Sequence, residues 1–481
     1  MGKHCHCAFS RRQFLQMTGG ALACSALQPL AARAAAARAA AAGINTTTPI
    51  FPKSRARVGL VFSHVPTGHA TWPTKDYDYG KRAAELTASL KKLCPRVDFD
   101  IHTAHNAAEA DAIIAATGDV DGYLVYAIGI WTRVPDRVMR SGKPVVLADD
   151  LFAGSGEVLI SSGVARREKL PVVVVSSSEI ADVARAADLF AALRAMKDSR
   201  ILDVVDRDIA DPAAKIKDLY GAEVLKLDSK ELAGYFDRAS VSEAETWASR
   251  WSRGAKKVVE PSREDLVNSG RMYLALAEAV AARRCDAATV DCLGMFYSGR
   301  VTAYPCLAFF QMNNDGSTGV CEGDLNSTCT QLLMRHITGR PGYVSDPVID
   351  TAKGEIIYAH CVAHNRAFGP GGRTNPYVIR SHAEDGRGAS VQSLLPAGET
   401  VTTLEIDVWS KRMVIHTANP KGAVLFLHGF PETLYAWKDI ALSLAGDYEV
   451  HAFDWPGFGL SSRPTLDRFS YAPRDLSLIH I

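Results

Sequence analysis

The residues best suited to catalysis or metal binding are two carboxylates on either side of a glycine, in the sequence C-E-G-D that ends at Asp324. Leu325 to Ile337 is predicted to form a helix that stops at Gly339, because glycine readily terminates helices. Both carboxylates therefore stand at the amino end of that helix. Asp324 can simply cap the helix while Glu322 complements its dipole. Alternatively, the two acids can present oxygens to one hard divalent cation such as Mg²⁺ or Mn²⁺.

The elements that must position these carboxylates follow an alternating pattern. Short β-branched runs such as Arg57–Ser63 alternate with helical stretches, and a second cycle of the same kind starts near Arg200 and includes a long helical region at Ser262–Arg284. Near-continuous apolar strands separated by helices indicate a parallel sheet that is covered on both faces. The sequence therefore predicts an α/β protein with two doubly wound parallel-sheet domains.

A polar turn follows the first predicted strand, and its sequence S-H-V-P-T-G-H contains His64 and His69. Loops at the carboxyl ends of parallel strands often line ligand pockets. Histidines in an exposed loop are more often solvated, and we expect that of both residues.

The order of motifs between Asp291 and Gly369 resembles the L-fucose/L-arabinose isomerase fold group: C-E-G-D, a helix ending T-G-R-P, an acid-rich stretch and A-H-C. The resemblance implies a β-barrel-like C-terminal region after two α/β domains. It also implies aldose-ketose interconversion of a sugar with a divalent metal, usually Mn²⁺. Asp324 would then be a metal ligand, Glu322 a second ligand or the proton-transferring carboxylate, and His360 part of the same pocket.

The chemical requirements of a sugar isomerisation do not depend on the resemblance. Isomerisation through an enediol moves a proton between adjacent carbons, so it needs a carboxylate base and a group that stabilises the developing oxyanion. A cation that bridges two sugar oxygens supplies that stabilisation. Glu322, Asp324 and a histidine would form a minimal set.

Two features depart from the isomerase pattern. Members of the group supply another carboxylate from a strand upstream of the E-x-D motif, whereas no Asp or Glu lies between Asp291 and Asp315, and Cys306 occupies roughly that region. They also draw a metal-site histidine from their last segment, whereas the resemblance here stops at Thr417. The β-rich region is therefore expected to be incomplete, and a non-catalytic carbohydrate-binding relative stays an alternative.

A different pattern follows Thr417. The predicted strand Ala423–Leu427 runs into His428-Gly429-Phe430, and a second strand leads to the D-W-P-G sequence that starts at Asp454. This order resembles the opening of an α/β-hydrolase of the epoxide-hydrolase and haloalkane-dehalogenase type. The resemblance implies that the H-G-F-P turn lends backbone N–H groups, notably that of Phe430, to an oxyanion or halide site.

The hydrolase pattern lacks its nucleophile. An α/β-hydrolase places the nucleophile on an elbow after a later strand, and the chain contains no G-x-S-x-G sequence. We therefore expect no hydrolase activity and suspect a truncated or spliced reading frame, or a natural fusion cut short. A hydrolase is the alternative function if a longer product restores the missing residues.

The first residues resemble a twin-arginine export signal. Arg11-Arg12 is followed by Phe14-Leu15, a modest apolar stretch from Met17 to Leu30 and an Ala/Arg-rich run to Gly43. One alternative is a disordered basic tail, and another is a lipoprotein signal with lipidation at Cys24. The signal predicts recognition by the twin-arginine export machinery and a periplasmic or exported protein.

Composition excludes several classes of protein. The 481 residues include 54 Lys+Arg against 53 Asp+Glu, which gives no broad electrostatic footprint for nucleic acid. Ten scattered Cys in so long a chain exclude a small disulfide scaffold. A small sugar is the expected ligand, and a homo-oligomer stays open.

The predicted organisation combines these features along the chain. We expect a signal and Ala-rich linker at 1–43, α/β domains at 56–175 and 176–345, a β-rich part at 346–418 and a hydrolase fragment at 421–481. The isomerase resemblance covers about 56–417 and the hydrolase resemblance about 421–475.

Overall fold

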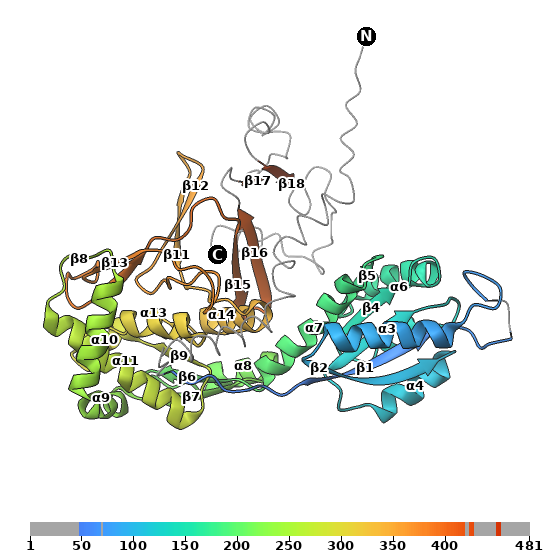
Figure 1. Cartoon of the computed structure of the whole chain (residues 1–481), viewed down its shortest axis with the longest axis horizontal. Coiled ribbons are helices and arrows are strands. Elements are labelled where there is room, and N and C mark those ends of the chain that lie inside the picture. Colours follow the sequence, from blue (N-terminus) through green and yellow to red (C-terminus); the bar gives the residue numbers. More distant parts are fainter. Residues whose placement is uncertain (1–47, 69–70, 419–422, 428–448, 454–481) are drawn as a thin grey trace, which may run out of the picture. The chain divides into compact units, whose positions relative to one another are not determined.

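The computed structural model describes residues 48–68, 71–418, 423–427 and 449–453 (Figure 1). Its residues fall into two compact units. Unit 1 comprises the chain up to Val344 together with Cys361–Ser393, and unit 2 comprises Ser345–His360 and the residues from Leu394 onward. Within the described ranges, no helix combines the length and apolar character needed to cross a membrane.

The first half of unit 1 is a parallel five-stranded sheet in the order β2-β1-β3-β4-β5. Two of its strands, Gly122–Ala127 and Val145–Asp149, are buried along their whole length, which explains their continuous apolar runs. Strands and helices alternate along the chain: β1 (Ala56–Ser63), α3 (Tyr79–Leu93), β2 (Val97–Ala104), α4 (Ala107–Ala116), β3 (Gly122–Ala127), α5 (Val134–Met139), β4 (Val145–Asp149), α6 (Ser155–Glu168), β5 (Val172–Ser176) and α7 (Ile180–Lys197).

The second half of unit 1 repeats this plan with a parallel sheet in the order β10-β9-β6-β7. In both sheets the first strand along the chain pairs with the second on one side and the third on the other. The elements are β6 (Arg200–Val204), α8 (Ala210–Tyr220), β7 (Glu223–Leu227), α9 (Ser229–Arg238), α10 (Val241–Gly254), α11 (Arg263–Arg283), β9 (Ala287–Val290), α12 (Cys292–Tyr297), α13 (Cys306–Asp315), β10 (Thr318–Val320) and α14 (Leu325–Thr338).

A small sheet completes unit 1, in the order β14-β13-β8. β13 (Tyr377–Arg380) pairs antiparallel with β14 (Ser390–Ser393) and parallel with β8 (Lys257–Val258). The late segment 361–393 thereby joins the α/β body through hydrogen bonds to a strand that is encoded much earlier.

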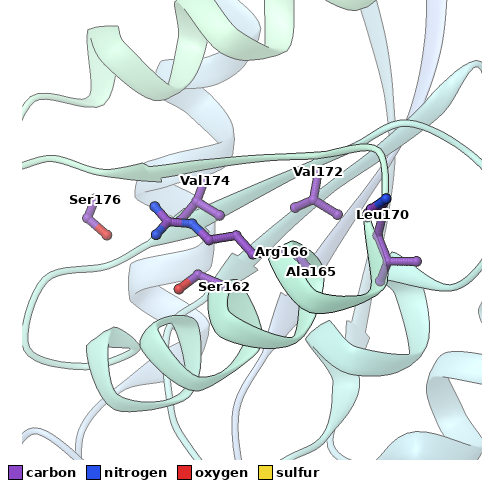
Figure 2. A pocket seen from close by; sticks show the side chains of 8 residues that line it. Ser162, Ala165, Arg166, Leu170, Val172, Val174 and Ser176 are labelled. Carbon is purple, nitrogen blue, oxygen red and sulfur yellow. The ribbon is translucent and has the colours of Figure 1, made fainter. Parts of the chain in front are cut away.

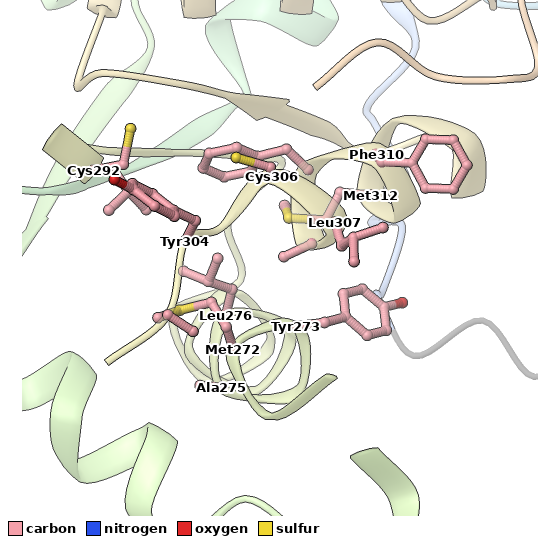
Figure 3. Packing of buried hydrophobic residues seen from close by; sticks show 14 of the residues in the cluster. Met272, Tyr273, Ala275, Leu276, Cys292, Tyr304, Cys306, Leu307, Phe310 and Met312 are labelled. Carbon is pink, nitrogen blue, oxygen red and sulfur yellow. The ribbon is translucent and has the colours of Figure 1, made fainter. Parts of the chain in front are cut away.

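The core of the second half lies between the sheet and its helices. Figure 3 shows Met272 and Leu276 of α11 facing Leu307 and Met312 of α13, and all four side chains are buried. Helices α10 and α11 approach closely at Gly270, where an added Cβ would lie 2.5 Å from the carbonyl oxygen of Ala244.

The segment before β1 is attached to the second half of unit 1. The Thr48 hydroxyl donates to the Tyr273 hydroxyl at 3.1 Å, and Lys53 Nζ donates to Asp286 at 2.6 Å. The side chain of Asp286 is buried. An ion pair of this kind is costly to break from one side, because the remaining charge stays desolvated.

Unit 2 is built from two antiparallel hairpins and a parallel pair. The hairpins are β11 (Asp346–Asp350) with β12 (Glu355–Ala359) and β15 (Val401–Asp407) with β16 (Arg412–Ala418). The Thr403 hydroxyl donates to the Tyr358 hydroxyl at 2.6 Å and links the hairpins. The parallel pair is β17 (Ala423–Leu427) with β18 (Glu449–Phe453).

The predicted fold class is confirmed. The structure contains two doubly wound parallel sheets followed by a β-rich region, and the predicted helices at 262–284 and 325–337 correspond to α11 and α14. The predicted domain boundaries stay predictions.

Candidate functional site

The carboxyl ends of β6, β9 and β10 form one edge of the second sheet, and the E-x-D motif lies in the turn that follows β10. Backbone bonds hold the turn against the sheet: Gly323 N–H donates to the Val290 carbonyl at 2.9 Å. The Arg207 guanidinium donates to the Gly323 carbonyl at 3.0 Å. The motif is therefore fixed at the position where parallel sheets usually bind ligands.

Two successive residues of this turn have left-handed backbone conformations. The φ angle is 67° at Glu322 and 63° at Gly323. A Cβ at Gly323 would lie 3.1 Å from the Arg207 guanidinium, so a glycine is suited to this position. For a residue with a side chain such as Glu322, the conformation costs on the order of 1 kcal/mol or more. The strained residue carries one of the two predicted catalytic carboxylates, and its side chain is exposed.

Asp324 is the N-cap of α14. Its Oδ1 accepts from the Ser327 N–H at 3.0 Å, and the Thr328 hydroxyl donates to the Asp324 carbonyl at 2.5 Å. The helix ends at Gly339 with a φ of 68°, as its sequence predicts. The capping interpretation is therefore confirmed. The role of Asp324 as a metal ligand stays a prediction.

His360 lies directly after β12, in unit 2. Its Nε2 is 3.6 Å from Oδ2 of Asp346, the first residue of the same hairpin. Its predicted partnership with Glu322 and Asp324, which belong to unit 1, stays a prediction.

Sequence reasoning missed one functional candidate at the sheet edge. Asp203 lies within β6, its side chain is fully buried, and neither carboxylate oxygen has a hydrogen-bond partner among the described residues. Burial raises the pKa of Asp203 to about 7, against the opposing influence of Arg207, whose guanidinium is 4.0 Å away. A single acid inside the apolar run I-L-D-V-V was the available signal.

The expectation that both histidines of the first polar turn are solvated is wrong for His64, while His69 lies outside the described residues. His64 is buried, its ring stacks on Tyr79 at 4.2 Å between centroids, and its Nδ1 is 2.7 Å from the Val65 carbonyl. Burial lowers the pKa of His64. Packing against Tyr79 at the carboxyl edge of the first sheet therefore explains why His64 is buried.

A separate cavity of about 730 Å³ lies between α6 and the edge strand β5 (Figure 2). None of the predicted site residues lines it. Its wall combines aliphatic side chains with serines and two basic residues: Ser162, Ala165, Arg166, Lys169, Leu170, Val172, Val174 and Ser176.

Two further predictions fall outside the described residues. They are the twin-arginine signal at 1–43 and the turn His428-Gly429-Phe430. The two strands predicted to flank that turn are present as β17 and β18.

Comparisons with known proteins find two different similarities. The family model for the α/β hydrolase fold matches residues 422–479. Sulfoquinovose isomerases of Priestia aryabhattai and Priestia megaterium are 24% identical over 153 residues, which are 31% of this chain and 33% of each relative. The chain thus matches about a third of the length of these curated relatives.

Two shorter or weaker matches accompany them. A fluoroacetate dehalogenase of a Burkholderia species is 48% identical over 42 residues, which are 9% of this chain and 14% of that protein. A solved ABC transporter solute-binding protein from Agrobacterium vitis with bound D-fucose is 10% identical and covers 63% of this chain and 95% of its own, at a TM-score of 0.16. That score is too low to support a structural argument. The chain therefore combines weak sugar-isomerase similarity with an α/β-hydrolase segment at its C-terminal end.

Proposed function

We propose that this chain is a metal-dependent aldose-ketose isomerase that resembles the L-fucose/L-arabinose group. The observation that carries the proposal is the fixed turn of Glu322 and Asp324 at the carboxyl edge of the second parallel sheet. The similarity to sulfoquinovose isomerases supports the same class of reaction, a sugar isomerisation.

The donor chemistry of the turn suits a hard divalent cation. Carboxylate oxygens are the ligands that Mn²⁺ and Mg²⁺ prefer. The capping bond uses Oδ1 of Asp324 and fixes the orientation of its carboxylate, which has a second oxygen to offer. Glu322 and Asp324, with His360 as the proposed third ligand, would hold the ion, and the bound ion would stabilise negative charge on the sugar oxygens.

Glu322 is the proposed proton carrier between the two sugar carbons. Its side chain is exposed, so a substrate can reach it, and the left-handed backbone at this residue fixes where the side chain leaves the turn. A general base must lie within hydrogen-bond reach of the proton that it removes. The glycine beside it, held by Arg207, keeps the turn in place while the proton moves.

The decisive experiment distinguishes a helix-capping role of Asp324 from a role in metal binding. Asparagine caps helices about as well as aspartate, so Asp324→Asn keeps α14 intact and removes the charge that a metal ligand needs. Proton exchange between solvent deuterium and a panel of aldoses and ketoses, including sulfoquinovose, is followed by NMR with added Mn²⁺. We expect Glu322→Gln and Asp324→Asn to lower exchange about 100-fold or more.

A matched control comes from α9. Asp228 is likewise an N-cap, and its side chain accepts from the Glu231 N–H. Asp228→Asn should leave the exchange rate unchanged. Full exchange in Asp324→Asn would show that Asp324 is a helix cap only. Sugar binding by the wild type without any exchange would favour the non-catalytic carbohydrate-binding alternative.

The C-terminal similarity supports a second candidate, an α/β-hydrolase. Its observation is the parallel pair β17 and β18 within the region that matches the hydrolase fold. We expect no turnover from this chain, because no nucleophile elbow is recognisable in its sequence. An ester, epoxide, haloalkane and fluoroacetate screen tests this expectation. Turnover that disappears when the residues after Pro420 are deleted would contradict it.

Export to the periplasm is proposed from the leader. The pair Arg11-Arg12 predicts that a reporter fused to residues 1–43 is exported by the twin-arginine machinery and stays inside when both residues are replaced by Lys. A reporter that remains in the cytoplasm with the native leader would remove this proposal.

A further inference from the structure

Four cysteines that are distant in the sequence gather at the end of the large core of unit 1. Cys292 begins α12 and Cys306 begins α13, while Cys321 follows β10 and Cys361 begins the late segment 361–393. The Sγ atoms of Cys292 and Cys321 are 3.6 Å apart, and those of Cys306 and Cys361 are 3.5 Å apart. A disulfide bond is about 2.05 Å long, so these are pairs of thiols. Figure 3 shows Cys292 and Cys306 with Tyr304 in this core.

His382 adds a nitrogen to the cluster. Its ring stacks on Tyr304 with centroids 4.1 Å apart and planes 12° apart, and the Tyr304 hydroxyl donates to Asp385 at 2.8 Å. The side chain is 6% exposed, and its Nδ1 has no hydrogen-bond partner among the described residues. Nδ1 is therefore a buried polar atom that a ligand would satisfy, on a ring whose orientation is already fixed.

The spacing of these groups fits one metal ion. One ligand atom from each of Cys306, Cys361 and His382 lies within 4.8 Å of the other two. Ligands around a tetrahedral zinc with bonds of about 2.3 Å lie roughly 3.8 Å apart, so small side-chain shifts would bring the three atoms into place. All three residues belong to unit 1.

Cys321 supplies a fourth ligand. Its Sγ is 3.6 Å from the Sγ of Cys292 and lies within 4.8 Å of the Sγ of Cys361. This position beside Cys361 places the Cys321 sulfur next to the other three ligands. The cluster therefore offers a cation three sulfurs and one imidazole nitrogen.

We propose that Cys306, Cys321, Cys361 and His382 bind one Zn²⁺ ion or a similarly soft cation, as a centre distinct from the Glu322 and Asp324 pair. Sulfur and imidazole ligands select such ions, whereas Mn²⁺ prefers oxygen. Binding releases three thiol protons and leaves three thiolates and a neutral imidazole on the ion. The centre ties the late segment 361–393 to α13 and does not depend on the proposed isomerase activity.

The test uses the reduced, metal-free full chain. Zn²⁺ uptake is measured by elemental analysis after gel filtration, and Co²⁺ is used as a spectroscopic probe, because a thiolate-to-Co²⁺ charge-transfer band reports sulfur ligation directly. We expect close to one ion per chain, the charge-transfer band, and protection of the cluster thiols from alkylation. Cys361→Ser should lose most of the band, and His382→Gln should lower Zn²⁺ affinity about 100-fold.

Cys329→Ser is the matched control, because Cys329 is a fully buried thiol of α14 in the same unit. It should keep uptake and the Co²⁺ band. Circular dichroism of the metal-free variants checks that each is folded, and His382→Gln serves if the Cys361 variant is not. Equal uptake by wild type, Cys361→Ser and His382→Gln would overturn the proposal. So would a reduced wild type that takes up no ion and forms only a Cys306–Cys361 disulfide on oxidation.

Discussion

Asp203 should make the stability of the second sheet depend on pH. Its carboxyl group is buried within β6 without a hydrogen-bond partner among the described residues, and burial raises its pKa from 3.8 to about 7. The folded chain thus holds a proton that the unfolded chain releases above about pH 4. Its contribution to stability is complete below that pH and is lost as pH rises toward 7.

The size of the effect follows from the shift. Three pKa units at about 1.4 kcal/mol each amount to about 4 kcal/mol, which is lost in full above pH 7. Asp203→Asn has the same shape and carries no charge at any pH. We expect the free energy of unfolding of Asp203→Asn, measured relative to that of the wild type, to increase by about 3 kcal/mol between about pH 5 and pH 8.

Urea unfolding at several pH values measures this difference. Tryptophan fluorescence is a suitable signal, because Trp247 and Trp251 are buried in the same core cluster as the flanking β6 residues Leu202 and Val204. Asp98→Asn is the control, since Asp98 is exposed on β2. Parallel pH curves for Asp203→Asn and the wild type would refute the reasoning.

Two further substitutions test the packing of unit 1. Lys53→Met should destabilise the chain by about 3–5 kcal/mol, because Asp286 stays buried without its cation. Calorimetry should show that the double variant with Asp286→Asn recovers most of that loss. Gly270→Ala should cost about 1–3 kcal/mol, because the new Cβ meets the Ala244 carbonyl; an unchanged melting temperature would show that α10 and α11 separate freely.

The fold could be predicted from the sequence because its signals are local. Apolar strands alternate with helices, and Gly339 and Asp324 end and begin α14 through bonds within a few residues. The packing of His64 was missed, because Tyr79 reaches it from another element. Asp203 was missed for a similar reason, because one acid in a strand gives no sign of what its side chain faces.

The cluster of cysteines in unit 1 shows most clearly which contacts could not be predicted from the sequence. Cys306 was noticed only where a carboxylate was expected. Its neighbour Cys361 is 55 residues away in the sequence, and the two meet because the segment after Cys361 adds strands to β8. No periodicity encodes a contact between segments so far apart. Only the sheet pairing brings these side chains together.

The attachment of Thr48 and Lys53 has a consequence for the order in which the chain folds during synthesis. Their partners Tyr273 and Asp286 are made 225 and 233 residues later. At about 5–20 residues per second, Lys53 waits roughly 10 to 50 seconds for its carboxylate to emerge from the ribosome. The first sheet, whose strands all lie between 56 and 176, can form during that delay. The segment that contains Thr48 and Lys53 is therefore synthesised early but forms its native contacts late.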